Sequence, residues 1–123
     1  MLNSSGYFGS MNAYSFNNIR EPLYAGTWYP GSEEELKSAV DNYLEQAVIP
    51  EMEGTVVGIV SPHAGFLYSG SVAGHAFKSV QGREIELVVI MGNAHREPFQ
   101  GAAIDDVMAY RTPLGLVDLD QEV

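Results

Sequence analysis

Two of the three histidines in this sequence follow short apolar runs. His63 lies three residues beyond Val60, and His95 lies four residues beyond Met91. If the two runs are neighbouring parallel strands, the loops after them emerge at the same edge of the sheet, where α/β proteins hold their ligands. Two imidazoles at one edge suit a divalent transition metal, and two histidines with an oxygen or sulfur donor form the open site of non-haem iron enzymes. We therefore predict a metal site, with His63 and His95 as ligands.

Each of these histidines also has a simpler explanation. A lone histidine in a loop is usually a hydrogen-bonding or packing residue, so the metal prediction depends on the pairing of the two loops. His75 falls inside a predicted helix and away from its apolar stripe, so we expect a surface role for it. Asp105 and Asp106 are candidates for a third ligand, although a polar turn explains them equally well.

Several residues next to the two histidines are candidates for lining the same pocket. Loop aromatics often cover a core, and an arginine such as Arg96 is commonly solvated or paired with a neighbour, here Glu97. The glycines of both loops would allow sharp turns and the close approach of a ligand. The predicted pocket-lining residues are Pro62, Gly65, Phe66, Tyr68, Gly92, Asn93 and Arg96.

The elements that must position these loops can be predicted from hydrophobic periodicity. The runs "TVVGIV" (55–60) and "IELVVIM" (85–91) are short and apolar on both faces, which is typical of central strands buried on two sides. A helix over roughly 71–80 would join them, and a crossover of this kind makes the two strands parallel. We predict an α/β fold with a mostly parallel sheet flanked by helices.

A second helix is predicted before the first strand. Ser32 and Glu35 form a capping box after the turn signal Pro30-Gly31, and apolar residues recur at helical spacing from Leu36 to Val48. Pro50 is expected to end this helix.

Composition limits the remaining possibilities. The chain has 123 residues, 46% of them hydrophobic, which suits one compact domain. A formal net charge of -10 argues against nucleic acid or an anionic membrane as a partner, and the absence of cysteine excludes thiolate ligands from this chain. The first residues carry no secretion signal, so we expect a cytoplasmic protein. We predict a flexible extension over 1–19 and the domain over 20–123.

Four motifs together resemble the Memo-like family, whose bacterial members are named AmmeMemoRadiSam system protein B. The motifs are "AGTWYP", "VGIVSPHAGFLYSGSVAGHAF", "VVIMGNAHREPFQGAA" and "YRTPLGLVDLD". The resemblance implies a fold similar to that of class III extradiol dioxygenases, with a metal pocket at the sheet edge. It also implies that the first two histidine ligands fall on His63 and His95.

The chain departs from the family pattern in two respects. Asn93 stands where the family often has proline, which changes loop stiffness more than chemistry. Family members are also more than twice as long, and the resemblance implies that their third protein ligand comes from sequence that would lie beyond Val123. We therefore expect this chain to correspond to the N-terminal portion of the family fold, to be inactive alone, and to self-associate through uncovered apolar surface.

The resemblance leaves two classes of function open. One is a metal-dependent redox or dioxygenase-like role with iron or copper, and the family name implies a radical-SAM partner protein. The other is a non-catalytic module that binds a protein or peptide. Fold analogy alone does not decide between them.

Overall fold

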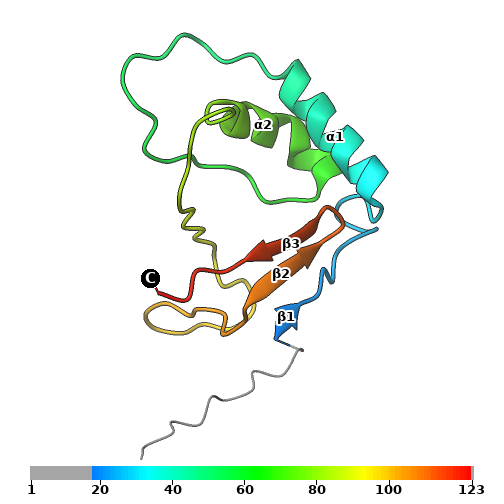
Figure 1. Ribbon diagram of the computed structural model, residues 1–123, viewed down its shortest axis with the longest axis vertical. Helices are drawn as coiled ribbons and strands as arrows, with labels where there is room; N and C mark the ends of the chain where they lie inside the picture. Colours follow the sequence, from blue (N-terminus) through cyan, green and yellow to red (C-terminus); the bar gives the residue numbers. More distant parts are fainter. Residues whose placement is uncertain (1–17, 123) are drawn as a thin grey trace, which may run out of the picture.

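The structure is a computed structural model that describes residues 18–122. It contains two helices that lie beside each other and a small three-stranded sheet, joined by long loops (Figure 1). The predicted α/β class is confirmed. Most of the predicted extension over 1–19 lies outside the described residues.

Helix α1 (Glu33–Gln46) confirms the predicted capping box. The Ser32 hydroxyl accepts a hydrogen bond from the backbone N–H of Glu35 at 3.3 Å and donates one to the Glu35 carboxylate at 2.9 Å. Three glutamates in the first turn also complement the positive end of the helix dipole. The helix ends before Pro50 because Ala47 is already extended, and the Ala47 side chain is buried.

Helix α2 (Phe66–Lys78) begins earlier than the sequence predicted. The sequence predicted a helix over roughly 71–80, whereas tertiary contacts fix the start at Phe66. The backbone N–H of Phe66 donates to the carbonyl oxygen of Trp28 at 2.8 Å, and the Ser69 hydroxyl donates to the carbonyl oxygen of Ala64 at 2.9 Å. These bonds satisfy polar groups at a helix start that has no side-chain cap.

The two helices pack through Tyr43 of α1 and two glycines of α2. A Cβ atom at Gly74 would lie 2.6 Å from the Tyr43 carbonyl oxygen, and one at Gly70 would collide with the Tyr43 ring. The Tyr43 hydroxyl reaches across to donate a hydrogen bond to the carbonyl oxygen of Phe66 at 3.0 Å. The absence of side chains at Gly70 and Gly74 thus permits the close approach of the helices.

The sheet has the order β1-β2-β3, comprising β1 (Ile19–Arg20), β2 (Ala109–Thr112) and β3 (Gly115–Asp118). β1 is parallel to β2, and β2 is antiparallel to β3. The prediction of a mostly parallel sheet was therefore wrong for these residues. The sequence analysis missed the β2–β3 hairpin, although Pro113 and Gly115, the latter at φ +123°, are typical turn residues.

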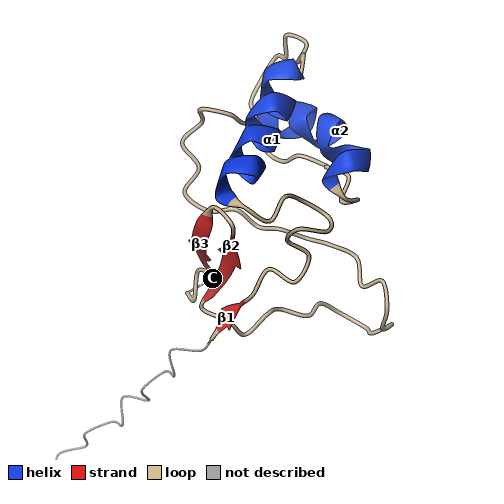
Figure 2. Cartoon of the chain, turned by 90° about the vertical axis from the view of Figure 1, so that its right-hand side faces the viewer, coloured by secondary structure: helices blue, strands red, loops and turns tan. Residues whose placement is uncertain are grey.

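The predicted central strands are not strands in this structure. Segments 55–60 and 85–91 lie in the loops on either side of α2. Figure 2 shows these connections as long loops that extend away from the helices and strands. Within the described chain, no backbone–backbone hydrogen bond outside the helices and strands involves either segment. Their pattern predicts an extended buried strand, but a strand also needs a neighbour to pair with.

A polar cluster holds β1 against β2. The Asp105 carboxylate accepts hydrogen bonds from the Tyr110 hydroxyl, at 2.8 Å, and from the Arg20 guanidinium, which also lies 5.7 Å from the centre of the Tyr110 ring. The hydrogen bond from Tyr110, followed by that from Arg20, lowers the pKa of Asp105. The same hydrogen bond to Asp105 raises the pKa of Tyr110.

Gly74→Ala should destabilise the helix pair. Alanine favours a helix by about 1 kcal/mol over glycine, but overpacking against the fixed Tyr43 carbonyl should cost about 1–3 kcal/mol, so the net change is unfavourable. Denaturant unfolding followed by far-UV circular dichroism measures this change. Gly58→Ala is the matched control because a Cβ at Gly58 meets nothing within 4 Å. Equal stability of the two variants would contradict the packing role of Gly74.

The Asp105 cluster should make β1–β2 pairing sensitive to pH. Because the pKa of Asp105 is lowered in the folded chain, its stabilisation is present above the ordinary aspartate pKa and is lost as the pH falls through the lowered value. We expect the Asp105 carboxyl NMR signal to titrate below the usual range and Tyr110→Phe to shift its midpoint upward. An Asp105 midpoint that stays unchanged in Tyr110→Phe would contradict the contact.

Candidate functional site

The structure brings His63 and His95 together. Their Nε2 atoms lie 3.1 Å apart, their ring centroids are 5.2 Å apart, and the ring planes are inclined by 50°. The two residues are 32 positions apart in the sequence and come from different loops, one before and one after α2. This proximity arises without the pair of parallel strands from which it was predicted.

The loop that carries His63 is anchored on one side by α2 and on the other by the aromatic loop before α1. The hydrogen bond from Phe66 to Trp28 joins the two, and the Phe66 ring packs 5.9 Å from Tyr29 and 6.0 Å from Tyr43. Gly65 lies in this junction, where an added Cβ would stand 3.2 Å from the Trp28 carbonyl oxygen. Tertiary contacts of the helix start therefore determine the position of His63.

Few contacts hold the loop that carries His95 in place. Gly92, Asn93 and His95 are exposed, and a Cβ at Gly92 would meet nothing within 4 Å. The His95 ring contacts the His63 ring. The geometry of the pair thus depends mainly on the anchored His63 loop.

Two chemical arrangements fit this pair. In one, a neutral imidazole donates its Nε2–H to the unprotonated Nε2 of the other. In the other, both nitrogens are unprotonated and bind one metal ion. Metal–nitrogen bonds of about 2.0–2.1 Å would place nitrogens 3.1 Å apart at an angle near 100° at the metal, close to the angles of common coordination geometries.

No third protein ligand joins the histidines in the part of the chain that the structure describes. Residues 18–122 contain no group of three or more His, Cys, Asp or Glu side chains placed to hold a metal ion. Asp105, a candidate for this position, is engaged by Arg20 and Tyr110 instead. The Nδ1–H of His75 donates to the carbonyl oxygen of Ser71, at 2.8 Å, on the exposed side of α2.

The predicted pocket-lining residues do not share one environment. Phe66 is half-buried between aromatic rings, whereas Tyr68 is 80% exposed. Arg96 is exposed and belongs to none of the ion pairs within 18–122. Their role as pocket residues stays a prediction.

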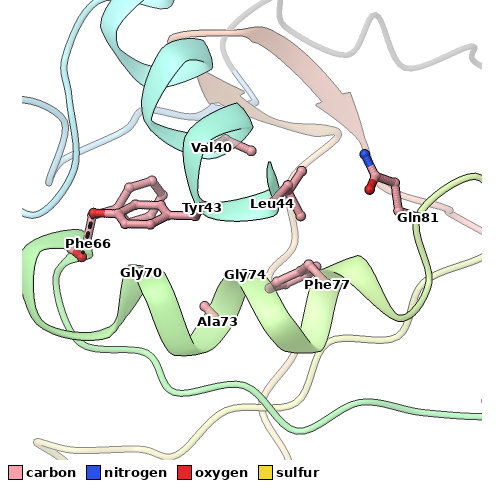
Figure 3. Close-up of a pocket in the computed structure, with 9 residues that line it drawn as sticks. All are labelled: Val40, Tyr43, Leu44, Phe66, Gly70, Ala73, Gly74, Phe77 and Gln81. Atoms are coloured by element: carbon pink, nitrogen blue, oxygen red, sulfur yellow. Dashed lines mark hydrogen bonds between the residues drawn. The ribbon is translucent and has the colours of Figure 1, made fainter. Parts of the chain in front are cut away.

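An apolar groove lies between α1 and α2, and we call it the helix groove. It has a volume of about 520 Å³, and most of its lining comes from facing sides of the two helices, with Gln81 just after α2 (Figure 3). The lining residues are Val40, Tyr43, Leu44, Phe66, Gly70, Ala73, Gly74, Phe77 and Gln81. The sequence analysis found both apolar stripes but did not predict a groove, because its existence depends on how the helices cross.

These features define an α/β chain with two loop histidines beside a helix start, and comparison with known proteins shows its family. Residues 20–123 match the family of Memo-like proteins. The chain belongs to this family, which confirms the resemblance found in the motifs. Neither helix within 18–122 has the length and apolar character needed to cross a membrane.

Three relatives indicate how far the similarity extends. The chain is 37% identical over 109 residues to a MEMO1 family protein of Nitrosopumilus maritimus, covering 85% of this chain and 39% of that protein. It is 36% identical over 104 residues to protein MEMO1 of Danio rerio, covering 85% and 34% respectively. It is 35% identical over 114 residues to the memo-1 homolog of Caenorhabditis elegans, covering 93% and 32%. The chain thus spans about a third of the length of the curated relatives it matches.

Gly65→Ala should separate the two histidines. The Trp28 carbonyl would have to move by a few tenths of an ångström, and the anchored His63 loop would move with it. We expect weaker nuclear Overhauser contacts between the His63 and His95 rings than in the unsubstituted chain. Gly92→Ala is the matched control, because open space surrounds that position. Loss of the ring contact in Gly92→Ala alone would contradict the anchoring role of Gly65.

Proposed function

We propose that this chain supplies a two-histidine half of a metal site, with a metal-dependent redox or dioxygenase-like role in the completed protein. His63 and His95 would hold the ion through their Nε2 atoms. Iron and copper are the candidate metals, because imidazole ligands suit both and neither prefers a site built from hard oxygen donors alone. When bound, the metal would supply the redox chemistry.

The observation that carries this proposal is the 3.1 Å separation of the two Nε2 atoms. Chance proximity of exposed side chains does not usually point the same ring atom of each residue at the other. The separation is short enough for both nitrogens to reach one ion, and both histidines are exposed, so a further ligand could approach an ion held there. Open positions are what a substrate and a small oxidant need at a catalytic metal.

The expected surroundings of this site come from the family. We infer that the complete fold resembles that of class III extradiol dioxygenases and that a radical-SAM protein is a partner. With two donors in this chain, metal binding should be weak, with water in the remaining positions. We also retain the cytoplasmic location as a prediction.

A second candidate function is a non-catalytic module that binds a protein or peptide. It is favoured by the exposure of both histidine loops, which leaves them accessible to a partner. In this alternative, His63 and His95 form a direct hydrogen bond, and any metal that binds is incidental.

Metal titration of the purified chain tests the proposal. We expect iron(II) or copper to bind in a one-to-one ratio, measured by elemental analysis after equilibrium dialysis. His63→Ala and His95→Ala should each weaken binding more than about tenfold, because changes in residues that only support ligands already cost this much. His75→Ala is the matched control and should bind as the unsubstituted chain does, since His75 bonds within its own helix.

Two results would contradict the metal site. One is a chain that binds neither metal under these conditions while its His63–His95 ring contact is intact. The other is a loss of binding in His75→Ala as large as that in the two ligand variants. Either result would favour the binding module.

A further inference from the structure

Ser69 carries a buried polar side chain close to the start of α2. The residue is 7% exposed, and within 18–122 it is the one polar residue that is buried. Burial of a hydroxyl costs free energy unless the hydroxyl is hydrogen-bonded. Here the hydroxyl donates to the carbonyl oxygen of Ala64 at 2.9 Å, so this single contact compensates for its burial.

The hydrogen bond from Ser69 leads out of its own helix. The backbone N–H of Ser69 donates to the carbonyl oxygen of Gly65, four residues earlier, as in any α-helix. The side chain reaches one residue further, to Ala64, which precedes the N-cap Gly65. A carbonyl before the N-cap takes no part in the hydrogen bonds of the helix itself. Ser69 therefore joins the helix to the loop residue that directly follows His63.

Few other contacts hold the backbone of His63. Within the described chain, no backbone–backbone hydrogen bond outside the helices and strands involves this residue, and the residue is exposed. On its N-terminal side, the ring of Pro62 fixes one backbone dihedral angle. On its C-terminal side, Ser69 holds the carbonyl of Ala64. Ser69 is also the first buried residue after His63, so it is the nearest anchor along the chain.

The histidine pair tolerates little displacement if it is to bind one ion. The two Nε2 atoms lie 3.1 Å apart. Two metal–nitrogen bonds can join nitrogens no farther apart than about 4 Å, the distance at which both bonds lie on one line. An outward movement of roughly 1 Å would therefore prevent His63 and His95 from sharing an ion.

We propose that Ser69 is a positioning residue for the candidate metal site. Its hydroxyl holds His63 within range of His95 through the Ala64 carbonyl. This inference rests on the proposed function for the role of the pair, whereas the positioning itself concerns the chain without metal. When the hydroxyl is removed, the Ala64 carbonyl loses its donor, and its peptide group can rotate and move His63 with it.

A separate set of contacts holds the two helices together. The Tyr43 hydroxyl donates to the carbonyl oxygen of Phe66 at 3.0 Å, and the centres of the two rings are 6.0 Å apart. These contacts do not use the Ser69 hydroxyl, which bonds to Ala64. Removal of the hydroxyl should therefore displace the His63 loop and leave the helix contact in place. A general loss of stability would weaken both.

NMR spectroscopy of the metal-free chain tests the positioning role. In Ser69→Ala, we expect the nuclear Overhauser contact between the His63 and His95 rings to be lost. The contact between the Tyr43 and Phe66 rings should remain, which shows that the helices still pack. Ser69→Thr keeps a hydroxyl and should retain both contacts.

Ser79→Ala is the matched control. The Ser79 hydroxyl also donates to a backbone carbonyl, that of Ala76, at 2.6 Å, but it does so at the opposite end of α2 from the His63 loop. The same hydroxyl is therefore removed from the same helix without a change at the candidate site. We expect Ser79→Ala to keep the contact between the histidine rings.

Copper affinity measures the consequence for the metal site. Ser69→Ala should bind copper(II) about tenfold more weakly than the unsubstituted chain in equilibrium dialysis, because residues that support metal ligands contribute at least this much. Ser69→Thr and Ser79→Ala should bind copper as the unsubstituted chain does.

Three results would overturn the proposal. Ser69→Ala could keep the histidine ring contact, or it could lose this contact and the Tyr43–Phe66 contact together, which would indicate a general packing role. Ser79→Ala could also disturb the histidine rings as much as Ser69→Ala does. If the unsubstituted chain binds no copper, the metal site fails, and the ring contacts of the metal-free chain still decide the role of Ser69.

Discussion

The close contact of Tyr43 with the glycines of α2 is the constraint on which the rest of the described structure depends. It sets the separation of the two helices, and the hydrogen bond from the Tyr43 hydroxyl fixes Phe66 at the start of α2. The His63 loop ends at that point. The packing of the two helices therefore also determines the position of His63, the candidate ligand. A larger residue at Gly74 would disturb both the helix groove and the loop.

The histidine pair shows how a candidate site can form without the scaffold expected for it. Parallel strands were predicted to bring the two loops to one edge, but the anchored start of α2 places His63, and the His95 ring meets it at 3.1 Å. The proximity of His63 and His95 was therefore predicted correctly, but the parallel strands on which the prediction was based are absent from the described structure. Ligation itself stays a prediction, because proximity of two imidazoles also fits a hydrogen bond.

The two apolar segments lead into the loops that carry His63 and His95. Both carry the composition of strands buried on two sides, yet they run as exposed loops beside α2. A strand needs a neighbour to satisfy its backbone hydrogen bonds, and within 18–122 neither segment is paired with one.

The sequence by itself determined features whose causes are local. The Ser32–Glu35 box fixed the start of α1, periodicity identified both helices, and four motifs identified the family. Tertiary structure decided where α2 begins, since a bond to Trp28 lies far outside any local window. It also decided the helix groove and the irregular conformation of 55–60 and 85–91. A strand is completed by a neighbour, and no pattern within six or seven residues specifies which neighbour is available.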